Sequence, residues 1–165
     1  MIRLAEQKDA PAILEIYNNA ILHTTAVYKY EEETLAERQQ WLLEKEAQGI
    51  PVFVLEEDGA VIGFATYGPF RIYPAYQFSI ENSIYVHPDH NGKGVASKLM
   101  ARLIEQAKES GYKTMIACID ADNAASIKLH EKFGFTYSGT LSNVGFKFDK
   151  WLNLAMYQLE LQDEE

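Results

Sequence analysis

The stretch that decides the fold spans residues 79–98 and reads Ser-Ile-Glu-Asn-Ser-Ile-Tyr-Val-His-Pro-Asp-His-Asn-Gly-Lys-Gly-Val-Ala-Ser-Lys. Its first part predicts a strand from about residue 76 to residue 87, which Pro88 ends. A loop at residues 89–94 with two glycines follows, and then a helix that ends at Gly111. Glycines let the backbone approach an anion, and the first turn of a helix attracts it. This loop is therefore where a phosphate-bearing ligand is expected.

Two common phosphate-binding motifs do not match this loop. A P-loop needs Gly five positions before Gly92 and Ser or Thr after Lys93, but His87 and Gly94 stand there. A Rossmann fingerprint needs Gly at the position of Ser97, and no acidic residue ends a strand about 20 residues further on. On spacing alone, an anion site and a loop that only turns the chain are equally open interpretations.

The rest of the chain predicts one mixed α/β domain over residues 1–165. The expected order is β-α-α-β-β-β-α-β-α-β-β, with helices on both faces of one mixed, mostly antiparallel sheet. Strands are expected at residues 1–4, 52–56, 60–67, 76–87, 113–119, 135–141 and 146–159. Asp9 and Pro11 open the first helix, and the later ones are expected at 33–48, from the glycine loop to Gly111, and from Asp122 or Asn123 to about Phe133. The helix at 33–48 has as its apolar content Leu35, Trp41, Leu42 and Leu43.

Composition and charge limit the class of partner. The formal net charge is −9, which disfavours nucleic acid and anionic membranes as partners. No apolar run approaches the roughly 18 residues of a membrane span, and no signal-peptide pattern opens the sequence. The single cysteine, Cys118, lies in an apolar run and is predicted to be a small buried hydrophobe rather than a nucleophile. These features favour a cytoplasmic protein.

Two polar residues, Glu81 and His130, are candidates for chemistry. Alternation places Tyr76, Phe78 and Ile80 on one face of the strand and Glu81 on the other, among hydroxyl groups. The pattern by itself favours a solvent-facing charge at Glu81 and a half-buried structural histidine at His130. The functional interpretation is a base in a cleft with a histidine nearby.

Residues 67–78 crowd aromatic side chains around Arg71. This segment is either a packed loop or a pocket wall whose arginine binds a carboxylate. His87 and His90 flank Asp89, but a metal site needs three or four ligands that converge, so we interpret them as loop residues and expect no metal.

Together these features resemble the GCN5-related N-acetyltransferase (GNAT) superfamily over nearly the whole chain. The acetyl-CoA loop of that superfamily reads Arg/Gln-x-x-Gly-x-Gly/Ala; Gly94 and Ala96 match it, whereas Asn91 replaces the long side chain. A second superfamily element, Asn followed by a small-residue turn and then Gly-Phe, is matched by Asn123 to Phe135.

The resemblance is closer to the phosphinothricin and methionine-sulfoximine acetyltransferases. The matching segments are Ile16–Ile21 with Thr24–Tyr28, Glu81–Val86, and Leu129–Phe135 with Val144–Phe148 and Trp151. The resemblance implies that Glu81 is the base and His130 the second catalytic residue, which overturns the plainer interpretation of both. It implies acetyl-CoA contacts at Ile84, Tyr85, Val86, Gly92, Lys93, Gly94, Val95, Ala96, Ser97 and Asn123. It implies acceptor contacts at Arg71, Ile72, Tyr73, Glu81, Asn82 and Ser83, and a homodimer.

The expected reaction moves an acetyl group from acetyl-CoA to the amine of a small amino-acid-like acceptor by direct attack. A carboxyl group of ordinary pKa, near ~4.3, is a poor base, so partial burial or a relay through water is expected at Glu81. Backbone N–H groups near residues 84–86 would polarise the thioester carbonyl, which suggests a bulge in the strand. His130 or Tyr85 would protonate the CoA thiolate. Acetylation of another amine (a polyamine, an antibiotic or a protein N-terminus) and acetyl-CoA binding without catalysis are the alternatives.

Overall fold

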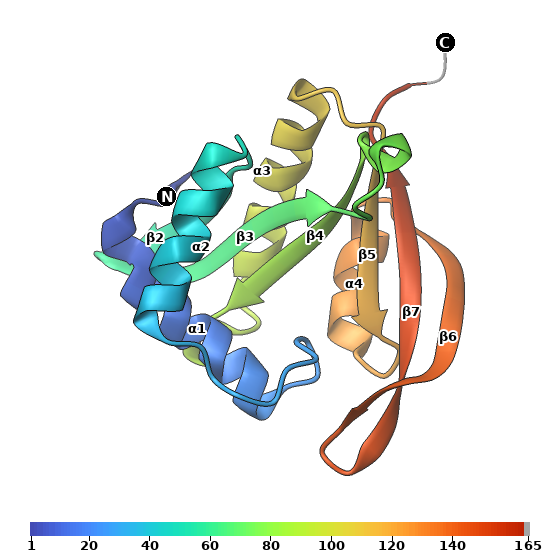
Figure 1. Cartoon of the computed structure of the whole chain (residues 1–165), viewed down its shortest axis with the longest axis horizontal. Helices are drawn as coiled ribbons and strands as arrows, with labels where there is room; N and C mark the ends of the chain where they lie inside the picture. The colour runs from blue at the N-terminus through green and yellow to red at the C-terminus, as the bar shows by residue number, and fades with distance from the viewer. Residues whose placement is uncertain (164–165) are drawn as a thin grey trace. The chain divides into compact units, whose positions relative to one another are not determined.

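The computed structural model describes residues 1–163 and contains the predicted order of helices and strands (Figure 1). The first half holds β1 (Ile2–Leu4), α1 (Ala10–His23), α2 (Leu35–Ala47), β2 (Val52–Glu57), β3 (Ala60–Pro69) and β4 (Ser79–Val86). The second half holds α3 (Val95–Glu109), β5 (Thr114–Asp120), α4 (Ala124–Lys132), β6 (Thr136–Lys147) and β7 (Lys150–Glu160). Short 3-10 helices lie at Gln7–Asp9, Pro74–Tyr76 and Pro88–His90.

The strands are hydrogen-bonded in the order β1-β2-β3-β4-β5-β7-β6. The β4–β5 pair is parallel, whereas the pairs β1–β2, β2–β3, β5–β7 and β6–β7 are antiparallel, which confirms the mixed, mostly antiparallel sheet. The chain divides into two compact units, one made of residues 1–67 and 83–103 and the other of residues 68–82 and 104 onward.

In the first unit, helices cover both faces of the β2–β3 hairpin, as predicted. Alternation along β2 turns Val52 and Val54 to the face where α1 and α2 pack. On the other face, Phe53 lies under the guanidinium of Arg102 from α3, at 4.6 Å from ring centre to Cζ. The hairpin turn has positive φ at Asp58 and Gly59 (52° and 80°), which confirms the turn predicted there.

Helix α2 buries less of its apolar content than the sequence predicts. Leu42 is buried and Trp41 half-buried, but Leu35 and Leu43 are exposed. Arg38 takes a core position instead: its guanidinium lies 4.0 Å from the Tyr17 ring and donates to Glu33 Oε2 at 2.6 Å. Aromatic faces and a carboxylate compensate the burial of this charge.

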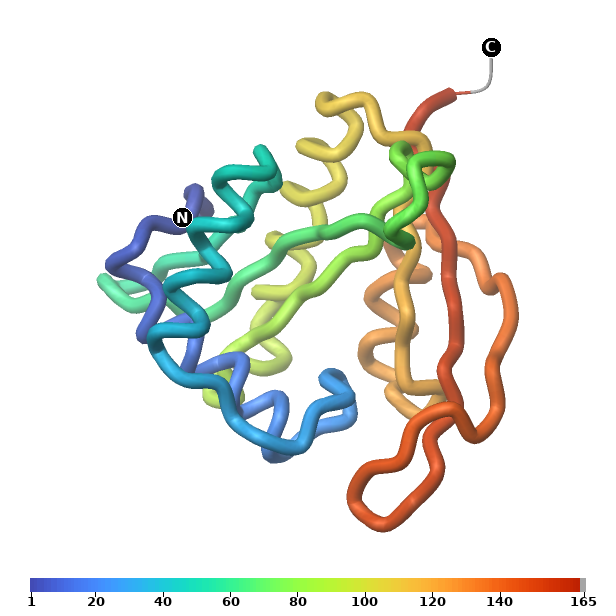
Figure 2. Tube along the Cα trace, in the orientation of Figure 1, coloured from blue at the N-terminus to red at the C-terminus, as the bar shows by residue number. Residues whose placement is uncertain are grey.

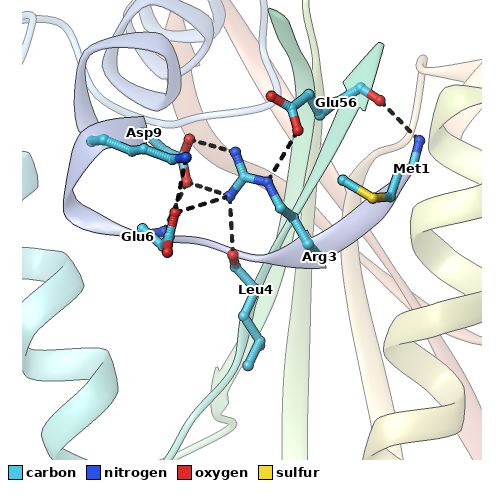
Figure 3. Close-up of polar contacts among 7 residues, drawn as sticks. Met1, Arg3, Leu4, Glu6, Asp9 and Glu56 are labelled. Carbon is cyan, nitrogen blue, oxygen red and sulfur yellow. Dashed lines mark hydrogen bonds and ion pairs between the residues drawn. The ribbon is translucent and has the colours of Figure 1, made fainter. Parts of the chain in front are cut away.

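The start of α1 is as predicted, with Asp9 at the N-cap and Pro11 in the first turn. The side chain of Asp9 makes no cap hydrogen bond but accepts from Arg3 at both oxygens, at 2.8 and 2.9 Å (Figure 3). Arg3 also donates to Glu56, so one guanidinium ties β1 to the helix start and to β2. The paired guanidinium lowers the pKa of Asp9 below its ordinary value.

In the second unit, β6 and β7 form a long hairpin (Figure 2). The predicted strands at 135–141 and 146–159 were wrong in their inner bounds, because pairing with β7 extends β6 to Lys147. The pairing of β6 with β7 shifts register at Tyr137/Gly139 and at Leu141/Gly145. The hairpin turns at its tip through Phe148 and Asp149, which both have positive φ.

The strand predicted at 76–87 is shorter, because Pro74 begins a 3-10 turn that reaches Tyr76. Of the apolar side chains assigned to one face, Tyr76 and Phe78 are exposed and Ile80 is buried. The parallel pairing with β5 joins Ser79–Glu81 to Thr114–Ile116, which fixes Glu81 opposite Ile116.

Candidate functional site

The glycine loop has the backbone geometry that an anion site requires. Gly92 and Gly94 have φ of +77° and +79°, and nothing lies within 4 Å of a Cβ placed on either. Lys98 N–H donates to Gly94 O at 3.2 Å and closes the first turn of α3. Val95 and Ala96 therefore begin the helix, where the first backbone N–H groups point out of its N-terminal end. A glycine loop followed by a helix start is the kind of backbone that can bind an anion.

Gly63 is a residue of this region that the sequence interpretation missed. A Cβ there would lie 2.9 Å from Val95 Cγ1, 3.0 Å from Leu99 Cδ1 and 3.2 Å from the carbonyl oxygen of Tyr85. The missing side chain therefore lets the first turn of α3 and the backbone of β4 approach the same point of β3. A glycine inside an apolar strand is the signal that points to such a close approach.

The predicted acetyl-CoA segment Ile84–Val86 lies at the end of β4 and is half-buried, although two of its three residues are aliphatic. The ring of Tyr85 packs against Phe64 and, edge to face, against Tyr17, at centroid distances of 5.2 and 5.4 Å. The first unit thus brings together Ile84–Val86 and the loop residues Gly92–Ser97.

The second unit brings together Glu81, Arg71 and Cys118. Cys118 Sγ lies 3.4 Å from Glu81 Oε1, and the charges of Glu81 and Arg71 both act on the thiol. Burial, followed by the neighbouring Glu81 carboxylate, raises the pKa of Cys118 to about 12. Cys118 is half-buried rather than fully buried, so the expectation of a buried hydrophobe was wrong, and its raised pKa excludes a thiolate nucleophile at neutral pH.

His130 is 6% exposed and contacts Asn82, the residue that follows Glu81 on β4. Its Nε2 lies 3.1 Å from Asn82 Nδ2, and its Nδ1 lies 2.7 Å from the carbonyl oxygen of Ser126. Burial lowers the pKa of His130 below 6.5, so the ring is neutral at pH 7. A carbonyl only accepts, so the proton is on Nδ1, and Nε2 accepts from the amide of Asn82.

The predicted acceptor-binding loop is open. Arg71, Ile72 and Tyr73 are exposed, so the packed-loop interpretation was wrong. The guanidinium of Arg71 lies 4.1 Å from the Phe70 ring centre and donates to the carbonyl oxygen of Phe70 at 2.8 Å. The acceptor of this hydrogen bond is a neutral carbonyl group. A carboxylate binds a guanidinium more strongly, so it can replace the carbonyl oxygen as the partner of Arg71.

Asn123 caps α4, since its Oδ1 accepts from Ser126 N–H at 3.1 Å, and this selects it over Asp122. His87 precedes the short 3-10 helix Pro88–His90, of which His90 is the last residue, and His87 Nδ1 accepts from Asp89 N–H. Within residues 1–163, no three His, Cys, Asp or Glu side chains gather as a metal site would need. No helix in that same range has the length and apolar character to cross a bilayer.

Comparison with known proteins gives a consistent result. The sequence profile of the Acetyltransferase (GNAT) family matches residues 12–135. An L-methionine sulfoximine/L-methionine sulfone acetyltransferase of Salmonella typhimurium is 43% identical, over 98% of this chain and 95% of its own. The crystal structure of an N-acetyltransferase from Staphylococcus aureus Mu50 is 57% identical with a TM-score of 0.97, over 98% of both chains. A phosphinothricin acetyltransferase from Sinorhizobium meliloti, in complex with acetyl-CoA, is 35% identical with a TM-score of 0.94, over 97% of this chain and 87% of that one.

Proposed function

Because this chain belongs to the acetyltransferase (GNAT) family and is an acetyl-CoA-dependent N-acetyltransferase, we propose that its acceptor is the α-amine of a small amino-acid-like molecule. The methionine sulfoximine, methionine sulfone and phosphinothricin type of acceptor is favoured by the names of its relatives. The observation that carries the proposal is the arrangement around Cys118, where a carboxylate and a guanidinium act on one half-buried thiol. A zwitterionic amino acid presents the matching pair, an ammonium group and a carboxylate.

Each charged residue has one task in this proposal. Glu81 takes a proton from the acceptor's ammonium group, directly or through water, and this frees the nitrogen lone pair. The amine attacks the thioester carbonyl, the new C–N bond forms, and the C–S bond breaks to release CoA thiolate. The nitrogen loses its second proton as the amide forms, and this proton, passed through water, balances the one that the thiolate takes up. Arg71 holds the acceptor carboxylate by a bidentate pair, with Ile72, Tyr73, Asn82 and Ser83 as further acceptor contacts. Holding both substrates together supplies the main rate gain.

In this proposal the first unit binds acetyl-CoA, whereas the contact expected at Asn123, a residue of the second unit, stays a prediction. Gly92–Ser97 would bind its diphosphate through backbone N–H groups, and the half-buried strand segment Ile84–Val86 would receive the acetyl-pantetheine end. The open space at Gly92 and Gly94 supports this assignment, because it lets backbone rather than side chain meet the phosphates.

His130 is the second residue on which turnover depends in this proposal, and it acts in its neutral form. Its low exposure and the hydrogen bonds at both ring nitrogens support this form. A neutral ring with its proton committed to Ser126 O is a poor donor to a thiolate. This favours a role in which His130 fixes the amide of Asn82, the residue next to Glu81.

The assembly and setting of the protein are also part of the proposal. The whole chain would act as one acetyltransferase domain in the cytoplasm. Homodimer formation is supported by the β6–β7 hairpin, whose tip region exposes large apolar side chains: Leu141, Val144, Phe146, Phe148 and Trp151. Sedimentation of the purified protein tests the dimer, and replacement of Phe148 and Trp151 by Ser should shift it toward the monomer.

A panel of acceptors with CoA release as readout tests the function. Methionine sulfoximine, methionine sulfone and phosphinothricin should be acetylated, whereas spermidine, an aminoglycoside and an N-terminal alanine peptide should not. Glu81→Gln should keep acetyl-CoA binding by calorimetry and lose most turnover. If Glu81→Gln turns over at nearly the wild-type rate, Glu81 is not the base. If the protein binds acetyl-CoA but consumes no acceptor of the panel, it is a non-catalytic binding module.

A further inference from the structure

Cys118 faces the carboxylate of Glu81 because of the strand register. Glu81 pairs with Ile116 across the parallel β4–β5 ladder, and Cys118 lies two residues further along β5. Residues two apart on a strand point to the same face, so the thiol and the carboxylate share one side of the sheet. Their contact, 3.4 Å between Sγ and Oε1, joins residues 37 apart in sequence.

The direction of this hydrogen bond follows from the chemistry of the two groups. An ionised carboxylate only accepts, so the thiol must donate. Burial and the adjacent carboxylate keep the proton on sulfur at neutral pH, against the weaker opposing effect of Arg71. The contact is therefore S–H to carboxylate oxygen in the enzyme that awaits its acceptor.

We propose that Cys118 is a positioning residue for the catalytic base: its S–H group holds Oε1 of Glu81, and the other carboxylate oxygen is left to take the proton of the acceptor. The inference rests on the proposed role of Glu81. A thiol suits this task because it is a weak donor. It can orient the carboxylate through one oxygen without occupying the other. Both side chains stand on paired strands, which hold the orientation better than loops do.

Kinetics of Cys118→Ala and Cys118→Ser test the proposal. Cys118→Ala removes the donor together with the sulfur atom, and we expect kcat to fall about tenfold, the size of one hydrogen bond to a charged group, with the KM for acetyl-CoA unchanged. Cys118→Ser keeps the shape and restores a donor, and it should keep kcat within about threefold of wild type. Ile119→Val, a buried change on the other face of β5, is the control and should leave kcat and the KM for acetyl-CoA unchanged.

Thiol labelling provides a test that does not depend on turnover, because Cys118 is the sole cysteine. Iodoacetamide should react slowly with the wild type at pH 8 and severalfold faster with Glu81→Gln, which lacks the negative charge. Equal labelling rates in wild type and Glu81→Gln, or equal kcat in wild type and Cys118→Ala, overturn the role of Cys118. An active Glu81→Gln variant instead overturns the proposed base, so the two failures are distinguishable.

Discussion

The side-chain amide of Asn82 and the imidazole of His130 are joined by a hydrogen bond of 3.1 Å between Nδ2 and Nε2. The ring is fixed in turn by Ser126, whose carbonyl oxygen lies 2.7 Å from Nδ1. Asn82 directly follows Glu81 on β4, so its side chain points to the opposite face of the strand, where the buried histidine of α4 contacts it. Energetic coupling between Asn82 and His130 is the consequence that can be measured.

Asn82→Ala and His130→Phe should each lower kcat, by about tenfold, because each removes the same hydrogen bond. His130→Phe retains a ring against Phe135, with which His130 makes an edge contact at 4.9 Å, so the packing is largely kept. The double variant should be about as active as the worse single variant. If the loss of kcat in the double variant equals the product of the two single losses, the two residues act separately.

The stability of the fold should depend on pH through His130. Burial lowers the pKa of His130 below its ordinary 6.5, so the unfolded chain takes up a proton on this ring at higher pH than the folded chain does. The contribution is complete above pH 6.5 and is lost as the pH falls from there through the folded pKa. Urea unfolding from pH 7.5 to pH 5 should therefore show a steeper loss in wild type than in His130→Phe. Parallel curves would contradict a neutral buried ring.

Short sequence patterns predicted much of the fold. Asp58-Gly59 predicted the β2–β3 turn, and the spacing of Val95, Leu99 and Leu103 predicted the buried face of α3. Asn123 was one of the two residues expected to cap α4, and it does so. The turn, the helix face and the helix cap each depend on residues close together in the sequence. Hydrophobic periodicity and capping preferences can therefore predict them.

The contacts that define the site depend on how the strands pair in register, and the local sequence pattern does not predict this pairing. Cys118 was assigned to the core because its neighbours are apolar, yet pairing with β4 places it beside Glu81. Alternation likewise assigned Tyr76 to the strand, although Pro74 turns the chain before the strand begins. In both cases a partner or a turn overrides the local preference.

Gly94 and Gly59 form a matched pair for a test of the anion loop. Their φ values are +79° and +80°, and nothing lies within 4 Å of an added Cβ at either position. Alanine at each should therefore cost the same stability, about 1–2 kcal/mol, the penalty of left-handed backbone for a residue with a Cβ. Only Gly94→Ala should weaken acetyl-CoA binding, by about tenfold or more, because its methyl group would lie in the proposed diphosphate site. Calorimetry measures the Kd for acetyl-CoA in Gly94→Ala and in the Gly59→Ala control. Equal Kd values in the two variants would show that Gly94 does not belong to the diphosphate site.

Arg71→Ala should raise the KM for an amino-acid acceptor and leave the KM for acetyl-CoA unchanged. The guanidinium lies over the Phe70 ring with one arm on the Phe70 carbonyl oxygen, and it is exposed, so it can turn to a ligand at small cost. We expect a rise of at least about tenfold, since a bidentate pair to a carboxylate is lost. Arg71→Lys should recover only part of it, because an ammonium group cannot bind both oxygens in the same plane. The acceptor's carboxamide provides the decisive control: without a carboxylate to bind, wild type and Arg71→Ala should have similar KM values. A difference that persists with the carboxamide, or an equal rise in the KM for acetyl-CoA, would show that Arg71 shapes the loop rather than binding the acceptor.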